Sequence, residues 1–250
     1  MNNQPMKLRK YLPFLFALIP SLALGETATP STIEELATDP AIGSHIAHEV
    51  KMPNYGFFIH EKGYLVGLHS KDGKILLSNI GEFILQKQLV DDGGRVTHEH
   101  AGWIKDEAVT AQIEETREGM DKAYKISIDS PTFLVNLTIV CKPKGPVLSY
   151  EFCARGFPED GGLSALVPVN FHQANVDVGE VEPDLNPVVL YGPQDESLAI
   201  EYSRDFKPYS QSGPAVVTGK TAMSFYPFAG LTPVPDDTKI PLELTLTFEN

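Results

Sequence analysis

Hydrophobic and polar residues alternate with a period of two along most of the chain from Tyr55 to the C-terminus. Such alternation is typical of β-strands that bury one face, and turn-forming residues interrupt it at intervals of about 8 to 12 residues. The last strand has the clearest pattern, with these residues expected to face inward: Ile240, Leu242, Leu244, Leu246 and Phe248. We therefore expect one antiparallel all-β domain, a β-sandwich over residues 55–250.

Segments 132–141 and 147–155 flank a turn and form the best-defined hairpin of this pattern. Matching their apolar faces directs Cys141 inward and Cys153 to the opposite face of the sheet. A disulfide tolerates only about 7 Å between its two Cα atoms. We therefore expect two free, buried thiols and no disulfide.

The region before Tyr55 follows different patterns. Residues 12–24 form an apolar run that follows three basic residues and ends in small residues, which is the pattern of a signal peptide over residues 1–25. This run falls short of the roughly 20 apolar residues that cross a bilayer. We expect the leader to be removed, leaving no membrane span, and the protein to be periplasmic or secreted.

Residues 26–54 are expected to form an N-terminal lead-in with one short helix. Ser31 and Glu34 have the spacing of a capping box, in which a hydroxyl and a carboxylate satisfy free backbone amides at a helix start. The fold class that we predict is thus an all-β sandwich with a short N-terminal helix.

The charge of the chain restricts its partners. Without the leader, which contains three basic residues and no acidic one, 17 basic and 33 acidic residues remain, a net charge of −16. Such a surface repels nucleic acid and anionic membranes, so we expect neither as a partner. A P-loop, a Gly-x-Ser-x-Gly elbow and a His-Glu-x-x-His motif are all missing from the sequence. The oligomeric state has no signature in the sequence.

Candidate chemistry begins with His98, His100 and Trp103. In a strand the two histidines would share a face, so they could bind a metal or a sugar hydroxyl. A cupin metal site also begins with His-x-His, but its second half is missing here, and we expect no metal and no cofactor. The alternative is a solvated turn with Trp103 packed on its edge.

A second candidate group comprises Asn170, His172 and Gln173, which are unusually polar for a segment between core-like runs. Buried polar groups need hydrogen-bond partners, either within the protein or in a ligand. Histidine can also transfer a proton near neutral pH. A structural histidine satisfied within the protein is the alternative.

Taken in order, these segments resemble the galactose mutarotase-like (aldose 1-epimerase) family. Segment 63–68 with its following Asp-Gly turn resembles the family's opening hairpin, and His98 or His100 with Gly102 and Trp103 resembles its His-Gly…Trp segment. Segment 148–152 precedes Asn170-Phe171-His172 as a similar hairpin precedes the family's second histidine. The resemblance covers roughly residues 55–250.

This resemblance implies a β-supersandwich fold and a carbohydrate ligand. It implies that His172 protonates the ring oxygen of a sugar while a glutamate, Glu201 or Glu196, removes the anomeric hydroxyl proton. It also implies that the substrate is bound by His98, His100, Trp103, Asn170 and Gln173. The expected function is an exported carbohydrate-active protein with epimerase-like acid–base chemistry.

Two alternatives remain open, because a fold alone does not determine a function. The first is a non-catalytic β-sandwich module that binds a glycan or a protein. The second is an accessory subunit without a small ligand, which would have an exposed apolar patch in place of a pocket. Removal of His172 separates an enzyme from a binding module, because only the enzyme would lose turnover.

Overall fold

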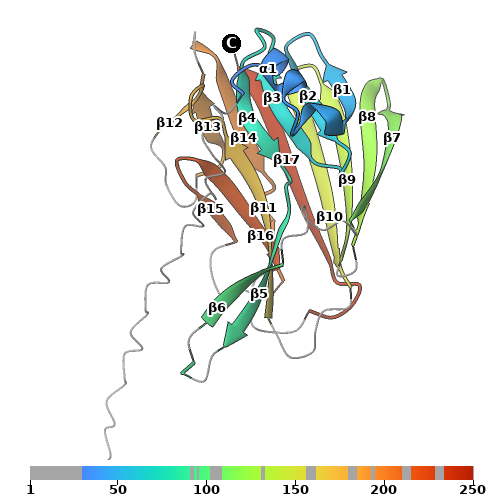
Figure 1. Ribbon diagram of the computed structural model, residues 1–250, viewed down its shortest axis with the longest axis vertical. Helices are drawn as coiled ribbons and strands as arrows, with labels where there is room; N and C mark the ends of the chain where they lie inside the picture. Colours follow the sequence, from blue (N-terminus) through green and yellow to red (C-terminus); the bar gives the residue numbers. More distant parts are fainter. Residues whose placement is uncertain are drawn as a thin grey trace, which may run out of the picture.

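The chain forms a sandwich of two antiparallel β-sheets, so the predicted fold class is confirmed (Figure 1). A computed structural model describes these residues: 30–90, 93–94, 96–101, 109–130, 133–155, 162–179, 185–192, 195–209, 215–228 and 234–249. Within these ranges no helix has the length and apolarity to cross a membrane.

The first sheet has nine described strands, arranged around β11 (Gly162–Phe171). One end of β11 pairs with β4 and the other with β5, so that the β5–β6 hairpin projects beyond the rest of the sheet (Figure 1). The other strands of this sheet are β1 (Ile46–Lys51), β2 (Tyr55–His60), β3 (Leu65–Ser70), β4 (Ile75–Ile80), β5 (Ile84–Val90), β6 (Val96–Ala101), β15 (Val216–Thr218) and β16 (Ala222–Phe228).

The second sheet has eight described strands in the order β12-β13-β14-β17-β10-β9-β8-β7. Its strands are β7 (Thr110–Glu118), β8 (Asp121–Asp129), β9 (Phe133–Lys142), β10 (Gly145–Ala154), β12 (Asp177–Val178), β13 (Val188–Tyr191), β14 (Ser197–Tyr202) and β17 (Lys239–Glu249). Each neighbouring pair that involves β8, β9, β10 or β17 is antiparallel. Short turns are sufficient for most of these connections, which explains the regular spacing of turn residues in the sequence.

The core lies between the two sheets and contains the inward residues of both. In β17 every second residue from Ile240 to Phe248 is buried, which confirms the inward face predicted for this strand. The β9–β10 hairpin also has the predicted arrangement. Cys141 lies opposite Pro146 and Cys153 opposite Leu134, and both thiols are free and buried.

An N-terminal strap, residues 30–42, crosses the outer face of the nine-stranded sheet. It contains helix α1 (Ile33–Thr38) and leads through the 3-10 turn η1 (Gly43–His45) into β1. The predicted capping box exists, but the sequence-based position is wrong by one residue. Thr32 is the N-cap and Glu35 its partner, because Ser31 still lies extended on the sheet, where its carbonyl accepts from Asn175.

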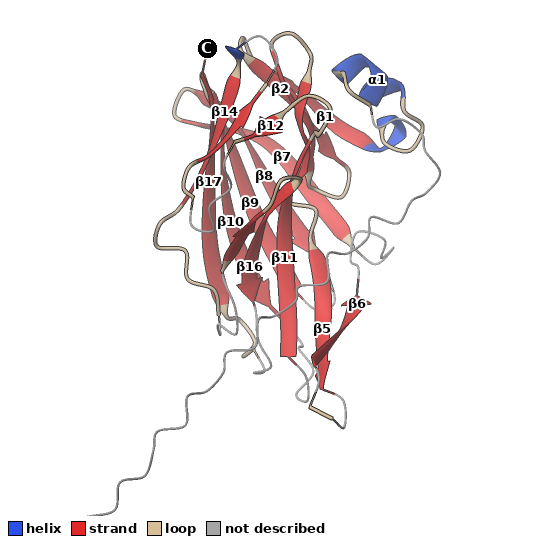
Figure 2. Cartoon of the chain, turned by 90° about the vertical axis from the view of Figure 1, so that its left-hand side faces the viewer, coloured by secondary structure: helices blue, strands red, loops and turns tan. Residues whose placement is uncertain are grey.

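The strap explains why strands β2, β3 and β4 are buried on both faces. Helix α1 lies outside the sandwich (Figure 2). A second apolar cluster packs between this helix and the sheet. Its fully buried members are Leu36, Phe58, Val66 and Ile75, and its half-buried members are Ile33, Ile42, Ile46 and Tyr64. The nine-stranded sheet is therefore the middle layer of three in this region.

Tyr150 provides a first test of the core. It is buried on β10 with its ring stacked on Phe152 at 5.5 Å between centroids, and its hydroxyl has no hydrogen-bond partner among the described residues. We expect Tyr150→Phe to raise the free energy of unfolding by about 1 kcal/mol, because it removes a desolvated polar group and keeps the ring. Urea unfolding measures this, and a loss of stability would show that the hydroxyl has a partner.

Candidate functional site

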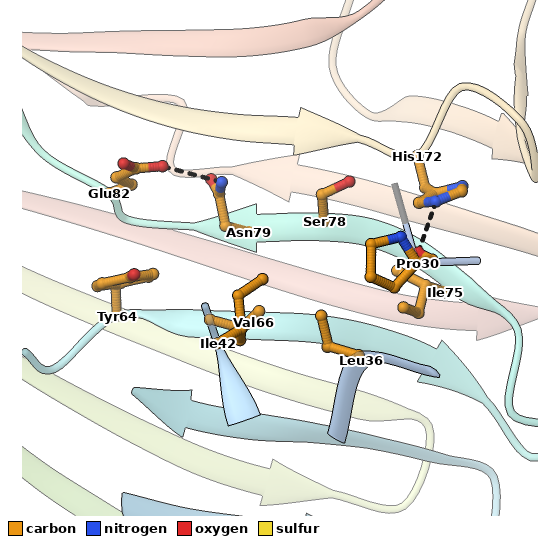
Figure 3. A pocket seen from close by; sticks show the side chains of 10 residues that line it. All are labelled: Pro30, Leu36, Ile42, Tyr64, Val66, Ile75, Ser78, Asn79, Glu82 and His172. Carbon is orange, nitrogen blue, oxygen red and sulfur yellow. Dashed lines mark hydrogen bonds between the residues drawn. The ribbon is translucent and has the colours of Figure 1, made fainter. Parts of the chain in front are cut away.

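A pocket of about 270 Å³ lies between the strap and the outer face of the nine-stranded sheet (Figure 3). The strap contributes Pro30, Leu36 and Ile42 to its lining. The sheet and its connections contribute the rest: Tyr64, Val66, Ile75, Ser78, Asn79, Glu82 and His172. The lining is thus apolar on the strap side and on β3, and polar along β4 and the turn that follows it.

The polar part of the pocket is a short chain of hydrogen bonds. Asn170 Nδ2 donates to Asn79 Oδ1 at 2.6 Å, and Asn79 Nδ2 donates to Glu82 Oε2 at 2.9 Å. These residues come from β11, β4 and the turn after β4, which the antiparallel β4–β11 pairing brings side by side. The chain orients a carboxylate at one end of the pocket, where it can accept hydrogen bonds from a ligand.

The aromatic part of the pocket is Tyr64, which lies below Glu82 at the left of Figure 3. Its ring stacks on His60 at 4.4 Å between centroids, and His60 in turn stacks on His45 at 5.6 Å. Burial, with a smaller contribution from the Glu82 carboxylate, raises the pKa of Tyr64, so its hydroxyl keeps its proton. Burial also lowers the pKa of His60 to about 4, so this ring is neutral at physiological pH.

His172 lies at the other end of the pocket from Glu82 (Figure 3). It follows β11 directly, where its backbone amide donates to the Leu76 carbonyl at 3.0 Å. Its side chain is only 3 % exposed, and Nε2 lies 2.9 Å from the Pro30 carbonyl oxygen. A carbonyl only accepts, so Nε2 carries the hydrogen, and this hydrogen is used within the protein. Nδ1 is buried without a partner among the described residues.

Neither of the predicted glutamates lines the pocket that contains His172. Glu201 is exposed on β14, between the buried Ile200 and the half-buried Tyr202, and so lies on the outer face of the eight-stranded sheet. Glu196 is half-buried in the turn before β14, where its carbonyl accepts from Gly192. The core separates the outer face that carries Glu201 from the outer face that carries His172.

The remaining predicted residues are distributed over the first sheet. His98 and His100 lie on β6, opposite Gln88 and Gln86 of β5, and their side chains are outside the described residues, as is Trp103 altogether. Gln86 pairs with Ser164 of β11, eight residues before His172. At about 3.3 Å per residue the backbones of the two sites are roughly 25 Å apart.

Asn170 and His172 both belong to the pocket region, whereas Gln173 is exposed in the turn that follows. Tyr64, Asn79 and Glu82 are pocket residues that the sequence pattern does not single out. The signal for two of them is a break in the alternation, because Asn79 and Glu82 flank Ile80 and Gly81 where β4 ends. Among the described residues no group of three His, Cys, Asp or Glu side chains could hold a metal ion.

Comparisons with known proteins give likenesses among solved structures only. No family model matches the chain, and no curated protein matches it. Among solved structures, the 4-alpha-glucanotransferase from Thermococcus litoralis is similar with a TM-score of 0.47 and 12 % sequence identity. The similarity covers 80 % of this chain and 37 % of that enzyme, so the chain spans little more than a third of the enzyme's length.

Proposed function

We propose that this protein binds a neutral carbohydrate in the pocket beneath the strap and does not transform it. The observation that carries the proposal is the composition of the pocket wall. A tyrosine ring and apolar side chains lie beside an oriented carboxylate and the Asn79 amide, which Asn170 holds from behind the wall. A sugar ring has both an apolar face and hydroxyl groups at its edge, and it matches such a wall on both counts.

The size and charge of the pocket narrow the ligand. Its volume of about 270 Å³ is just below the usual range of ligand pockets, roughly 300–1,000 Å³. One sugar residue is therefore the natural occupant. The lining contains the Glu82 carboxylate and, among the described residues, no lysine or arginine. Together with the net charge of −13 for the whole chain, this favours a neutral sugar over a sulfated or uronic one.

The predicted leader and the family resemblance also support this proposal, the leader for the location of the protein and the resemblance for its ligand. The leader predicted over residues 1–25 supports a protein that works in the periplasm or outside the cell. The resemblance of segments 63–68 and 148–172 to galactose mutarotases supports a sugar as ligand. Galactose, glucose and maltotriose are therefore suitable probes, with galacturonate as the charged comparison.

Glu82→Gln is expected to weaken binding of the preferred neutral sugar by 10- to 100-fold. Hydrogen bonds to charged groups contribute about 1.5–3 kcal/mol, and about 1.4 kcal/mol corresponds to a factor of ten. Isothermal titration calorimetry measures the change. Glu201→Gln is the matched control, because it removes an exposed carboxylate on the opposite sheet and should leave affinity unchanged. A loss of binding in Glu201→Gln alone would place the site on the eight-stranded sheet.

A second candidate function is supported by one observation. His172 and Glu82 line the same pocket from its two ends, as an acid and a base would on either side of a sugar (Figure 3). Polarimetry on freshly dissolved α-galactose and α-glucose tests it. Mutarotation accelerated by the wild-type protein and abolished in His172→Gln at saturating sugar would establish epimerase-like catalysis. An unchanged rate, with binding intact, leaves the binding function.

A further inference from the structure

We propose that the N-terminal strap forms one wall of the ligand site. Docking of the strap on the sheet and binding of the sugar are then one coupled equilibrium. This inference rests on the proposed function. The strap supplies Pro30, Leu36 and Ile42 to the pocket lining, while the sheet and its connections supply the polar and aromatic groups. A ligand that contacts both sides interacts better with the docked state than with the undocked one, and so shifts the equilibrium toward docking.

The main chain of the strap forms hydrogen bonds with the nine-stranded sheet. Ile33 N donates to the Gly73 carbonyl at 3.0 Å, Ile75 N donates to the Ser31 carbonyl at 3.2 Å, and Thr32 forms an antiparallel bridge with Lys74. These bonds join the strap to the β3–β4 turn and the start of β4. They do not depend on the strap's side chains. They therefore determine where the strap lies along the sheet, but not how closely it packs against the sheet.

Two side chains from the segment after β11 hold the strap by consecutive carbonyl groups. His172 Nε2 donates to Pro30 O at 2.9 Å, and Asn175 Nδ2 donates to Ser31 O at 2.7 Å. Asn175 Nδ2 also lies 2.9 Å from the Ile75 carbonyl oxygen. Asn175 does not line the pocket. It is therefore a positioning residue, which can be changed without removing a contact to the ligand.

How closely the strap packs against the sheet is determined by Leu36, the buried residue of α1. A Cβ atom on Gly67 of β3 would lie 2.3 Å from Leu36 Cδ2, and Gly67 has a φ of +65°. The missing side chain at Gly67 therefore makes the seat for Leu36. Gly67 does not line the pocket either, so it offers a second way to displace the strap from outside the ligand site.

The strap has little stability of its own. Helix α1 has six residues, and isolated helices shorter than about 12 residues are marginal in water. Its order therefore depends on the apolar cluster and on the hydrogen bonds described above. Segments held in this way can open locally without unfolding the core. When the strap detaches from the sheet, the pocket loses the wall that the strap forms, and the ligand site opens.

The test combines hydrogen exchange with calorimetry on the full chain, using the neutral sugar that binds best among galactose, glucose and maltotriose. Exchange at the Ile33 and Ile75 amides reports docking whether or not a sugar binds. Gly67→Ala and Asn175→Ala should each speed this exchange at least ten-fold and weaken sugar binding by the same factor by which they lower the docked fraction, because apparent affinity falls with that fraction. Saturating sugar should slow the exchange in the wild-type protein.

Gly119→Ala and Asn136→Ala are the matched controls. Gly119 also has a positive φ, +62°, but open space around it, and Asn136 is an exposed asparagine of β9. Both should leave exchange at Ile33 and Ile75 unchanged. Exchange at Ile33 and Ile75 that saturating sugar does not slow would overturn the coupling, and exchange unaltered in the two strap variants would overturn the assigned roles of Gly67 and Asn175. Absence of sugar binding by the wild-type protein would instead reject the proposed function, while the exchange data still report docking.

Discussion

Gly145→Ala is expected to be the most destabilising single-methyl substitution considered, lowering the free energy of unfolding by about 3 kcal/mol or more. Gly145 begins β10, directly after the tight turn from β9. A Cβ atom there would lie 1.9 Å from the carbonyl oxygen of Leu246, which is backbone and cannot rotate away. Phe248 N donates to the Lys144 carbonyl at 2.7 Å, so β17 is bound closely to this same turn.

Gly119→Ala serves again as the comparison for this substitution. Gly119 also lies in a hairpin turn with a positive φ, but nothing lies within 4 Å of the added methyl group. Its cost should be limited to the left-handed backbone, about 1–2 kcal/mol. Urea unfolding of the two variants measures the difference. Equal losses would mean that close approach of β17 is not what selects glycine at position 145.

Acid is expected to destabilise the protein through His60, by up to about 3 kcal/mol between pH 6.5 and pH 4. The side chain is 6 % exposed, and burial, reinforced by nearby His45 and Lys62, lowers its pKa to about 4 against a partly opposing Glu61. A hydrogen bond also favours the neutral ring. His60 Nδ1 accepts a hydrogen bond from the Lys62 backbone amide at 3.1 Å, and this bond would be lost on protonation. The unfolded chain takes up the proton at higher pH than the folded chain does. This contribution to stability is therefore complete above pH 6.5 and is lost as the pH falls toward 4.

Chemical denaturation at a series of pH values tests this expectation. His60→Gln should flatten the dependence of stability on pH between 6.5 and 4, because the substituted side chain does not titrate. His48→Gln, on the adjoining strand β1, is the matched control. A wild-type slope that survives in His60→Gln would assign the acid sensitivity to other groups.

The local pattern of the sequence predicts those parts of the fold in which one strand face meets the core. β17 and the β9–β10 hairpin follow strict alternation, and the opposite orientations of Cys141 and Cys153 follow from it. The pattern does not predict β1 or the β15–β16 pair. β1 has a single buried residue, Val50, and β15 has three half-buried residues, so neither strand has a strong apolar face.

The pocket is harder to predict than the fold because its walls come from distant parts of the chain. His172 and Asn170 stand out as polar residues in an apolar segment, and both belong to the pocket region. Glu82 does not stand out, since a glutamate beside a glycine is ordinary in a turn. Its position beside Asn79 and Tyr64 depends on how β3 and β4 pair, which a single sequence does not specify. The strap that closes the pocket is specified by contacts with residues that follow β11.

Those contacts also constrain the order in which the protein folds. The bonds from His172 and Asn175 to the strap span 142 and 144 residues of sequence. Such long loops form late, because the entropy of closing them is lost before the contacts compensate for it. The strap is the first described segment to leave the ribosome, yet its anchoring partners are synthesised well over a hundred residues later. It is therefore expected to dock among the last steps of folding, after β3, β4 and β11 have already formed the surface that receives it.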